Sequence, residues 1–191
     1  QVLGNTSTSS GGGLYNNGGT VTLDGVTLSN NTANTASGSG GGIYNSNGNL
    51  TIQGSSTLST NTARLGGGIY LTDTGSHTVS VDMSVSISSN TATNNGGGVY
   101  INNGTVTIGN ASGGLVTVSS NLASNSGSGL YQAGGNLTLR YCTVSSNGSS
   151  TAGSGGGIRS ASTLTISHCT FANNRVNTAS GLGAGIYLNS S

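Results

Sequence analysis

The side chains that could perform acid–base chemistry are few in this chain of 191 residues. Its acids are Asp24, Asp73 and Asp82, and it contains neither glutamate nor lysine. Hydrolysis of a glycosidic bond requires two carboxyl groups roughly 5 to 10 Å apart, one of which keeps its proton and acts as the acid. No glutamate and no lysine is available to tune these aspartates. We therefore predict that the chain is not an enzyme and has no catalytic residue.

Metal-ligating side chains are equally scarce. Calcium sites need several converging carboxylates, and zinc sites need clustered histidine or cysteine. His77 and His168 lie far apart in the sequence, and we expect each to cap a turn or to stack in a surface ladder. The sequence therefore predicts no metal site and no cofactor.

The charge excludes two further classes of protein. The bases are Arg64, Arg140, Arg159 and Arg175, and the formal net charge is +1. Nucleic-acid binding requires several basic side chains on one face to neutralise phosphates, so no nucleic-acid partner is expected. No stretch approaches the roughly 20 apolar residues that span a bilayer, so no membrane span is expected either.

The arrangement of the aliphatic residues indicates β-structure. They recur in short alternating runs such as Leu50-Thr51-Ile52, Val106-Thr107-Ile108 and Leu164-Thr165-Ile166, which is the pattern of half-buried strands. Proline is absent and glycine occurs 36 times. No segment has the 3.6-residue period of an amphipathic helix, so essentially no α-helix is expected.

A repeat organises these strands. A run of small residues followed by an aliphatic residue, and usually by tyrosine, recurs every 26 to 31 residues, with starts near Gly11, Gly40, Gly66, Gly96, Gly127, Gly155 and Gly183. Each repeat contains three strand-like segments in fixed order. A period of this length is the signature of a solenoid. We predict a single domain over residues 1–191, an all-β right-handed parallel β-helix of about seven rungs with three strands per rung.

Equivalent residues fall into columns, which favours stacked coils over antiparallel hairpins. One column is asparagine: Asn31, Asn61, Asn90, Asn121, Asn147 and Asn174. Asparagine tolerates the left-handed backbone of a tight corner, and asparagine side chains stacked at the strand spacing can hydrogen-bond to one another. We therefore predict a structural asparagine ladder.

A second column is aromatic: Tyr15, Tyr44, Tyr70, Tyr100, Tyr131, then Arg159, then Tyr187. Each follows an inward aliphatic residue, so strand alternation places it outside. Such a ladder could bind a glycan or a cell-surface partner. Alternatively, tyrosine is there because it suits strands and stacks on itself, with Arg159 making a cation–π contact.

The repeat also places Asp24 and Asp82 in one column, two rungs or about 9.5 Å apart. This separation would suit a polysaccharide lyase or hydrolase, but isolated aspartates at strand ends are typical turn formers. An enzyme of this kind is kept as an alternative hypothesis for function.

Cys142 and Cys169 occupy equivalent repeat positions, so they are expected to stack in adjacent rungs within the Cα range of a disulfide. Val26, Val85 and Val116 fill the same position elsewhere. The pair is thus either a disulfide or two buried thiols acting as small apolar side chains.

The Gly-Gly-Gly-Ile motif, together with a hydrophobic-x-x-Asn motif such as Phe171-Ala-Asn-Asn174, resembles the repeats in passenger regions of polymorphic outer-membrane proteins and related autotransporter-like surface proteins. The resemblance covers nearly the whole chain. It implies a right-handed parallel β-helix displayed at the cell surface, commonly for adhesion.

Three expectations about function follow. A surface of Ser, Thr and Asn without lysine suits an extracellular or cell-surface location. The chain starts and stops inside coils, and uncapped solenoid ends expose unpaired strand edges, so we expect copies to stack head to tail into a filament or surface stalk. The alternative is an adhesin that binds a glycan or host partner through the tyrosine ladder.

Overall fold

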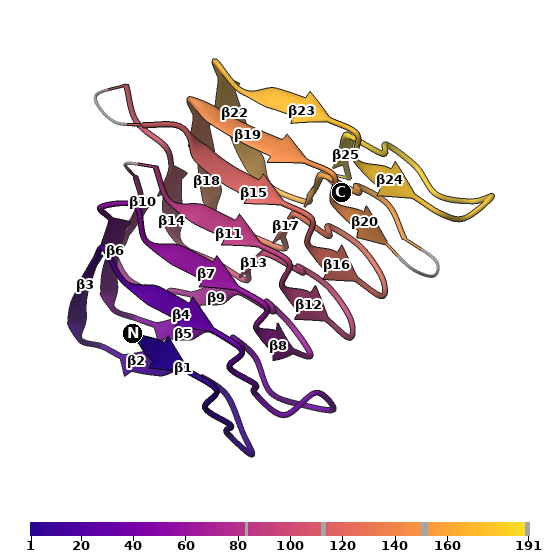
Figure 1. Ribbon diagram of the computed structural model, residues 1–191. Coiled ribbons are helices and arrows are strands. Elements are labelled where there is room, and N and C mark those ends of the chain that lie inside the picture. The colour runs from indigo at the N-terminus through magenta and orange to yellow at the C-terminus, as the bar shows by residue number, and fades with distance from the viewer. Residues whose placement is uncertain (83, 112–113, 150–152, 190–191) are drawn as a thin grey trace.

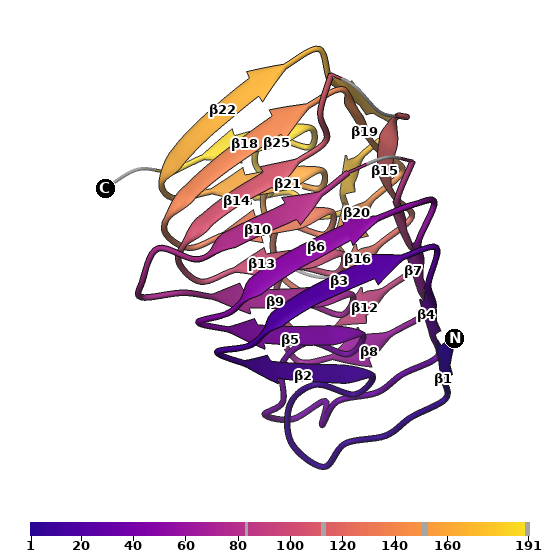
Figure 2. The same cartoon turned by 90° about the vertical axis from the view of Figure 1, so that its left-hand side faces the viewer.

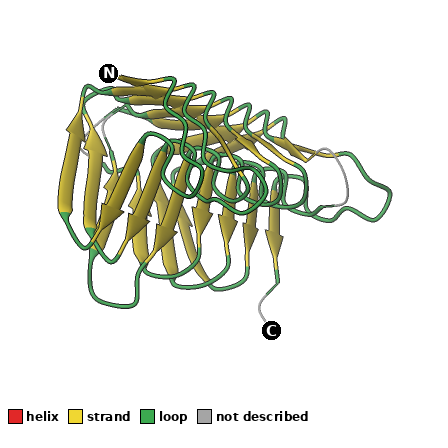
Figure 3. Cartoon of the chain, turned by 90° about the horizontal axis from the view of Figure 1, so that it is seen from below, coloured by secondary structure: helices red, strands yellow, loops and turns green. Residues whose placement is uncertain are grey.

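The computed structural model describes residues 1–82, 84–111, 114–149 and 153–189. These residues form 25 β-strands and no helix, and the chain winds into a parallel β-solenoid of about six turns (Figure 3). All strand pairs are parallel and join successive coils. The described residues contain no helix of the length and apolarity needed to cross a membrane.

Each full coil passes through four sheets, here called sheets 1 to 4 in chain order. Sheet 1 carries the tyrosine column and consists of β2 (Leu14–Asn17), β5 (Ile43–Ser46), β9 (Ile69–Thr72), β13 (Val99–Ile101), β17 (Leu130–Gln132), β21 (Ile158–Ser160) and β25 (Ile186–Leu188).

Sheet 2 faces the viewer in Figure 2. It consists of β3 (Thr20–Asp24), β6 (Asn49–Gln53), β10 (Thr78–Val81), β14 (Thr105–Ile108), β18 (Asn136–Arg140) and β22 (Thr163–Ser167). Its alternating sequence sends one set of side chains inward, as with Leu50 and Ile52, and the other set outward.

Sheet 3 crosses the front of the molecule in Figure 1. It consists of β1 (Val2–Leu3), β4 (Thr27–Ser29), β7 (Thr57–Ser59), β11 (Ser86–Ser88), β15 (Val116–Ser119), β19 (Cys142–Ser145) and β23 (Thr170–Ala172). Its inward column is the hydrophobic position of the hydrophobic-x-x-Asn motif: Leu28, Leu58, Ile87, Val118, Val144 and Phe171.

Sheet 4 corrects the prediction of three strands per rung. After each ladder asparagine from Asn61 to Asn174 the chain makes a further short strand. These strands pair into a sheet of β8 (Thr62–Ala63), β12 (Thr91–Ala92), β16 (Leu122–Ala123), β20 (Gly148–Ser149) and β24 (Arg175–Val176). Two residues are too few to show an alternating pattern in the sequence. The inward alanines are nevertheless buried, as at Ala63 and Ala92.

The core is one continuous stack of aliphatic side chains that runs the length of the coil axis. Like residues stand on like because the register is exact from coil to coil: Ile43 pairs with Ile69 and then with Val99, and Leu50 with Val79 and then with Val106. Each coil therefore buries its apolar face against its neighbours.

The predicted asparagine ladder is present as a chain of hydrogen bonds. In each step the backbone N–H and the side-chain Nδ2 of one asparagine donate to the Oδ1 of the next, at 2.9–3.0 Å. The same Nδ2 also donates to a sheet 3 carbonyl of the preceding coil, as Asn90 does to Leu58. Asn5 makes the same pair of bonds to Asn31 and is a further ladder member that the prediction left out.

The backbone reason given for this column was wrong. The left-handed residues are those that precede the ladder asparagines, with φ between 55° and 57°: Asn30, Thr60, Ser89, Ser120, Ser146 and Asn173. The ladder position selects asparagine because its amide both donates and accepts. The corner before it takes Asn, Ser or Thr.

The glycine runs are a consequence of this ladder. A Cβ at Gly68 would lie 2.6 Å from the carbonyl oxygen of Gly98 and 3.1 Å from Nδ2 of Asn90, so a larger residue would displace the amide. At the start of the run, Gly66 turns the chain from sheet 4 into sheet 1 with φ +61°, a conformation that glycine adopts at little cost.

Replacing Asn90 with alanine should strongly destabilise the fold. The change leaves the buried N–H of Asn61 without its acceptor and removes the Nδ2 hydrogen bonds to Leu58 and Asn121. An unpaired buried group costs about 1–3 kcal/mol, and each lost hydrogen bond about 1 kcal/mol. Urea denaturation should therefore show a loss of about 4 kcal/mol for Asn90→Ala. Asn102 is exposed on the next coil with one side-chain hydrogen bond to Thr72, and Asn102→Ala should change stability by less than about 0.5 kcal/mol. Equal effects of the two variants would contradict the ladder's structural role.

Candidate binding surface: the tyrosine ladder and the groove beside Arg159

The tyrosine column of sheet 1 is a continuous stack of rings. Consecutive rings from Tyr15 to Tyr131 have centroids 4.7–5.2 Å apart and interplanar angles of 5–11°. The strand register pairs Tyr15 with Tyr44, Tyr44 with Tyr70, and so on, so the spacing of the sheet sets the spacing of the rings. The side chains point outward, as predicted.

This stacking limits what the ladder can bind. Each inner ring has both faces covered by neighbouring rings, so ring edges and hydroxyl groups form the outer surface. Tyr15 is 55% exposed and is the member with the most open ring. A sugar that stacks on an aromatic ring needs a free face, and Tyr44, Tyr70 and Tyr100 do not offer one.

Burial within the stack also makes the hydroxyl groups harder to ionise. Burial, and then the neighbouring Tyr44 and Tyr100, raise the pKa of Tyr70 to about 12. Burial likewise raises the pKa of Tyr44 and of Tyr100, while Arg64 and Arg159 act on Tyr100 in the opposite direction. Two guanidinium groups therefore contribute positive potential to this face.

Arg159 interrupts the ring stack. It pairs with Tyr131 on one side and with Tyr187 on the other. Its guanidinium carbon lies 4.8 Å from the ring centroid of Tyr131, and Nη1 donates a hydrogen bond of 2.6 Å to the Tyr131 hydroxyl. The predicted cation–π contact is thus present. Among the described residues, Tyr187 belongs to no stacked ring pair.

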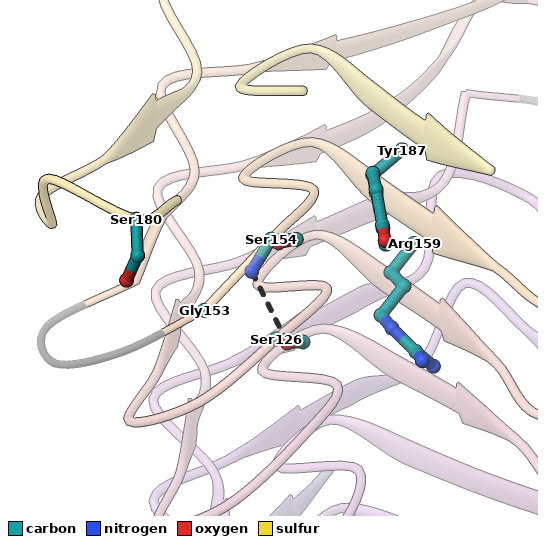
Figure 4. A pocket seen from close by; sticks show the side chains of 6 residues that line it. All are labelled: Ser126, Gly153, Ser154, Arg159, Ser180 and Tyr187. Atoms are coloured by element: carbon teal, nitrogen blue, oxygen red, sulfur yellow. Dashed lines mark hydrogen bonds between the residues drawn. The ribbon is translucent and has the colours of Figure 1, made fainter. Parts of the chain in front are cut away.

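A groove opens where the ladder is interrupted. It has a volume of about 260 Å³ and is lined by Ser126, Gly153, Ser154, Arg159, Ser180 and Tyr187. Figure 4 shows Ser126 and Ser154 between Ser180 on one side and Arg159 with Tyr187 on the other.

The polar groups of the groove are hydrogen-bond donors. Oγ of Ser126 accepts the N–H of Ser154, and Oγ of Ser154 accepts the N–H of Leu182. Each of these hydroxyl groups keeps its own proton to donate. The three aspartates of the chain lie elsewhere, at the end of sheet 2 strands or between sheets 1 and 2. The groove therefore suits a ligand that accepts hydrogen bonds or carries negative charge.

Comparison with protein families agrees with this geometry. The family model described as a right-handed beta helix region matches residues 79–191, more than half of the chain. The chain belongs to the right-handed β-helix family. No curated protein and no solved structure matches it. The narrower resemblance to outer-membrane and autotransporter passengers stays a prediction.

The β-helix keeps Asp24 and Asp82 in the predicted column but separates them with the intervening coil. Asp24 pairs with Gln53, whose Nε2 donates to the aspartate at 3.0 Å. Asp82 comes directly after Val81, which pairs with Ile52, and its Oδ2 accepts a hydrogen bond from the Ser80 hydroxyl. Each carboxylate thus has a partner on its own part of the surface.

The two histidines have local partners, as expected. Asp73 accepts hydrogen bonds from the N–H groups of Gly75 and His77 and lies 2.8 Å from Nδ1 of His77. Burial alone would raise the pKa of Asp73, but these hydrogen bonds lower it below its ordinary value. His168 stacks on Tyr141 with centroids 4.7 Å apart.

A second buried polar column escaped the sequence analysis. Asn16 donates to Oδ1 of Asn45 at 2.6 Å, and three coils further on the hydroxyl of Ser160 donates to Oε1 of Gln132 at 2.7 Å. These side chains face inward at the end of sheet 1 and bond the carbonyls of the following turns, as Gln132 does with Gly135. The intervening Leu71 and Ile101 break the pattern, so no repeat was visible.

The ladder should lose stability in alkali. Because the folded pKa of Tyr70 is raised to about 12, its contribution is present below the ordinary tyrosine pKa of about 10 and is lost as pH rises through the folded value. Urea midpoints should therefore fall between about pH 9 and pH 12. Tyr70→Phe keeps the ring and removes the ionising hydroxyl, so its midpoint should fall less. An equal fall in both proteins would contradict the burial of this hydroxyl.

Proposed function

We propose that this β-helix is a non-enzymatic structural rod that works outside the cell and continues head to tail into a filament or surface stalk. The observation that carries the proposal is the direction of the asparagine ladder. Every member donates to the next coil along the chain and accepts from the one before. The ladder therefore has a donor end and an acceptor end.

These two ends are complementary. Asn174, the last described member, donates its Nδ2 to the carbonyl of Val144, and its backbone N–H has no acceptor among the described residues. A cavity of about 420 Å³ lies at this end, lined by Ser146, Asn173, Asn174 and Arg175. At the other end, Oδ1 of Asn5 receives no donor from the described residues. A further coil, or a second copy of the rod, would join the two groups in the geometry of the internal steps.

The surface composition supports a location outside the cell. Charged residues make up 4% of the chain and lysine is absent, so hydroxyl and amide groups dominate the exterior. Weak net charge also gives little repulsion between copies. The absence of a tuned pair of carboxyl groups in the sequence supports the proposal that the rod performs no catalysis.

Electron microscopy of the purified protein at high concentration tests the assembly. We expect filaments whose long axis follows the coil axis. Asn5→Lys places an ammonium against the donor end of the next copy and should abolish the filaments. Asn102→Lys, which adds the same charge at an exposed position on a middle coil, should leave them intact. Only monomers of the unmodified protein, or filaments of Asn5→Lys, would overturn the proposal.

A second candidate function is adhesion through an acidic glycan, and the groove beside Arg159 favours it. The groove combines a guanidinium, hydroxyl donors and the ring of Tyr187, a set suited to a sugar that bears a carboxylate. This site differs from the tyrosine ladder as first predicted, since the inner rings of the ladder cover one another.

Binding of hyaluronan oligosaccharides, measured by calorimetry, tests the groove, with neutral chitin oligosaccharides as the control ligand. Arg159→Gln should weaken hyaluronan binding by about tenfold or more, because a charged hydrogen bond contributes about 1.5–3 kcal/mol. Arg140→Gln makes the same charge change on sheet 2, away from the groove, and should bind like the unmodified protein. Absence of binding, or equal binding by Arg159→Gln, would remove this candidate.

A further inference from the structure

The two cysteines of the chain meet between consecutive coils. β19 pairs with β23 in register from Thr143 and Thr170 onward, so Cys142 and Cys169, one position earlier, stand one above the other. Their Sγ atoms lie 2.9 Å apart, and Sγ of Cys169 also lies 3.2 Å from the carbonyl oxygen of Ser167. The sulfurs therefore face each other, although parallel stacking by itself would point the two Cβ atoms the same way.

The backbone on both sides of the pair is matched as well. The residues before the cysteines, Tyr141 and His168, both have left-handed φ values, 46° and 52°, and their rings stack at 4.7 Å. Adjacent parallel strands are about 4.8 Å apart, which lies inside the Cα range of disulfides, about 4.4–6.8 Å. Little backbone movement is needed to join the sulfurs.

Packing alone does not call for two thiols here. On the preceding coil, Val116 occupies the position equivalent to Cys142. Val85 is likewise buried in its coil. Valine therefore fills this place in the core elsewhere. The coil that contains Cys169 is the less well covered of the two: Ile166 is 37% exposed, and Phe171 is only half-buried. A covalent link at this point would fasten that coil to the one before it.

We infer that Cys142 and Cys169 form an inter-coil disulfide when the protein meets a small disulfide oxidant. Both residues are free thiols in this structure. Cys169 is half-buried and Cys142 is buried, so Cys169 is the thiol that an external reagent reaches first.

The reaction balances with oxidised glutathione as the oxidant. The thiolate of Cys169 attacks one sulfur of glutathione disulfide, which forms a mixed disulfide and releases one glutathione. The sulfur of Cys142 then attacks Sγ of Cys169, gives up its proton to solvent and releases the second glutathione. Burial and the neighbouring thiol raise the pKa of Cys142, so the second step should be the slower one and should accelerate with pH.

Mass spectrometry after incubation with oxidised glutathione tests the link. We expect the mass of the intact chain to fall by two hydrogen atoms. After proteolysis without reduction, the peptide with Cys142 and the peptide with Cys169 should be found linked to each other. A cross-link that closes a loop of this length should lower the unfolding equilibrium constant on the order of 100-fold, seen as a higher urea midpoint for the oxidised protein than for the reduced one.

Cys142→Val with Cys169→Val is the matched control, because valine fills the column in other coils. This variant should fold, should have the same midpoint with and without oxidant, and should match the reduced protein. A mixed disulfide that persists at Cys169, dimers linked between chains, or equal midpoints for oxidised and reduced protein would each overturn the inference. Filament formation by the valine variant is a separate readout, so failure of the cross-link leaves the proposed assembly to its own test.

Discussion

The hydrogen bond from each ladder asparagine to the next is the interaction on which the rest of this structure depends. One amide joins three coils: Asn90 accepts from Asn61, donates to Asn121 and also donates to the carbonyl of Leu58. Because these groups are buried, a coil that slipped by one residue would leave several donors and acceptors unpaired. The ladder thus fixes the register, and the register aligns the aliphatic core, the glycine corner and the tyrosine stack.

Much of the fold could be predicted because the same sequence pattern occurs in every repeat. The spacing of the glycine runs predicted the coils, and the asparagine column from Asn31 to Asn174 was correct at every member. Features that do not repeat visibly were lost. The two-residue strands of sheet 4 are too short to alternate, and the polar pairs Asn16–Asn45 and Gln132–Ser160 are separated by two apolar coils. The left-handed corner was assigned one residue late, because asparagine suits both that corner and the ladder.

The candidate site was predictable in its residues but not in its geometry. The sequence places the tyrosines outside and Arg159 among them. The side-chain torsions decide whether the rings stack face to face, and the sequence does not determine those torsions. Stacked rings cover one another's faces, so the surface that stays open to a ligand lies beside Arg159, where the stack is interrupted. The departure from the repeat at Arg159 thus opens the groove, while the regular positions stabilise the sheet.

The close fit of glycine against the asparagine amide has a consequence for how such a chain can change length. The strands and the ladder asparagine of each coil pair with the two coils beside it, mostly through residues of the same type. Excision of residues 66–95 would bring Leu65 to Gly96, Ile43 beneath Val99 and Asn61 beneath Asn121. These pairs have the same residue types as pairs that the fold already contains, such as Ile69 with Val99 and Asn90 with Asn121. Whole coils are therefore interchangeable units, and a gene that gained or lost one would lengthen or shorten the molecule without any other substitution.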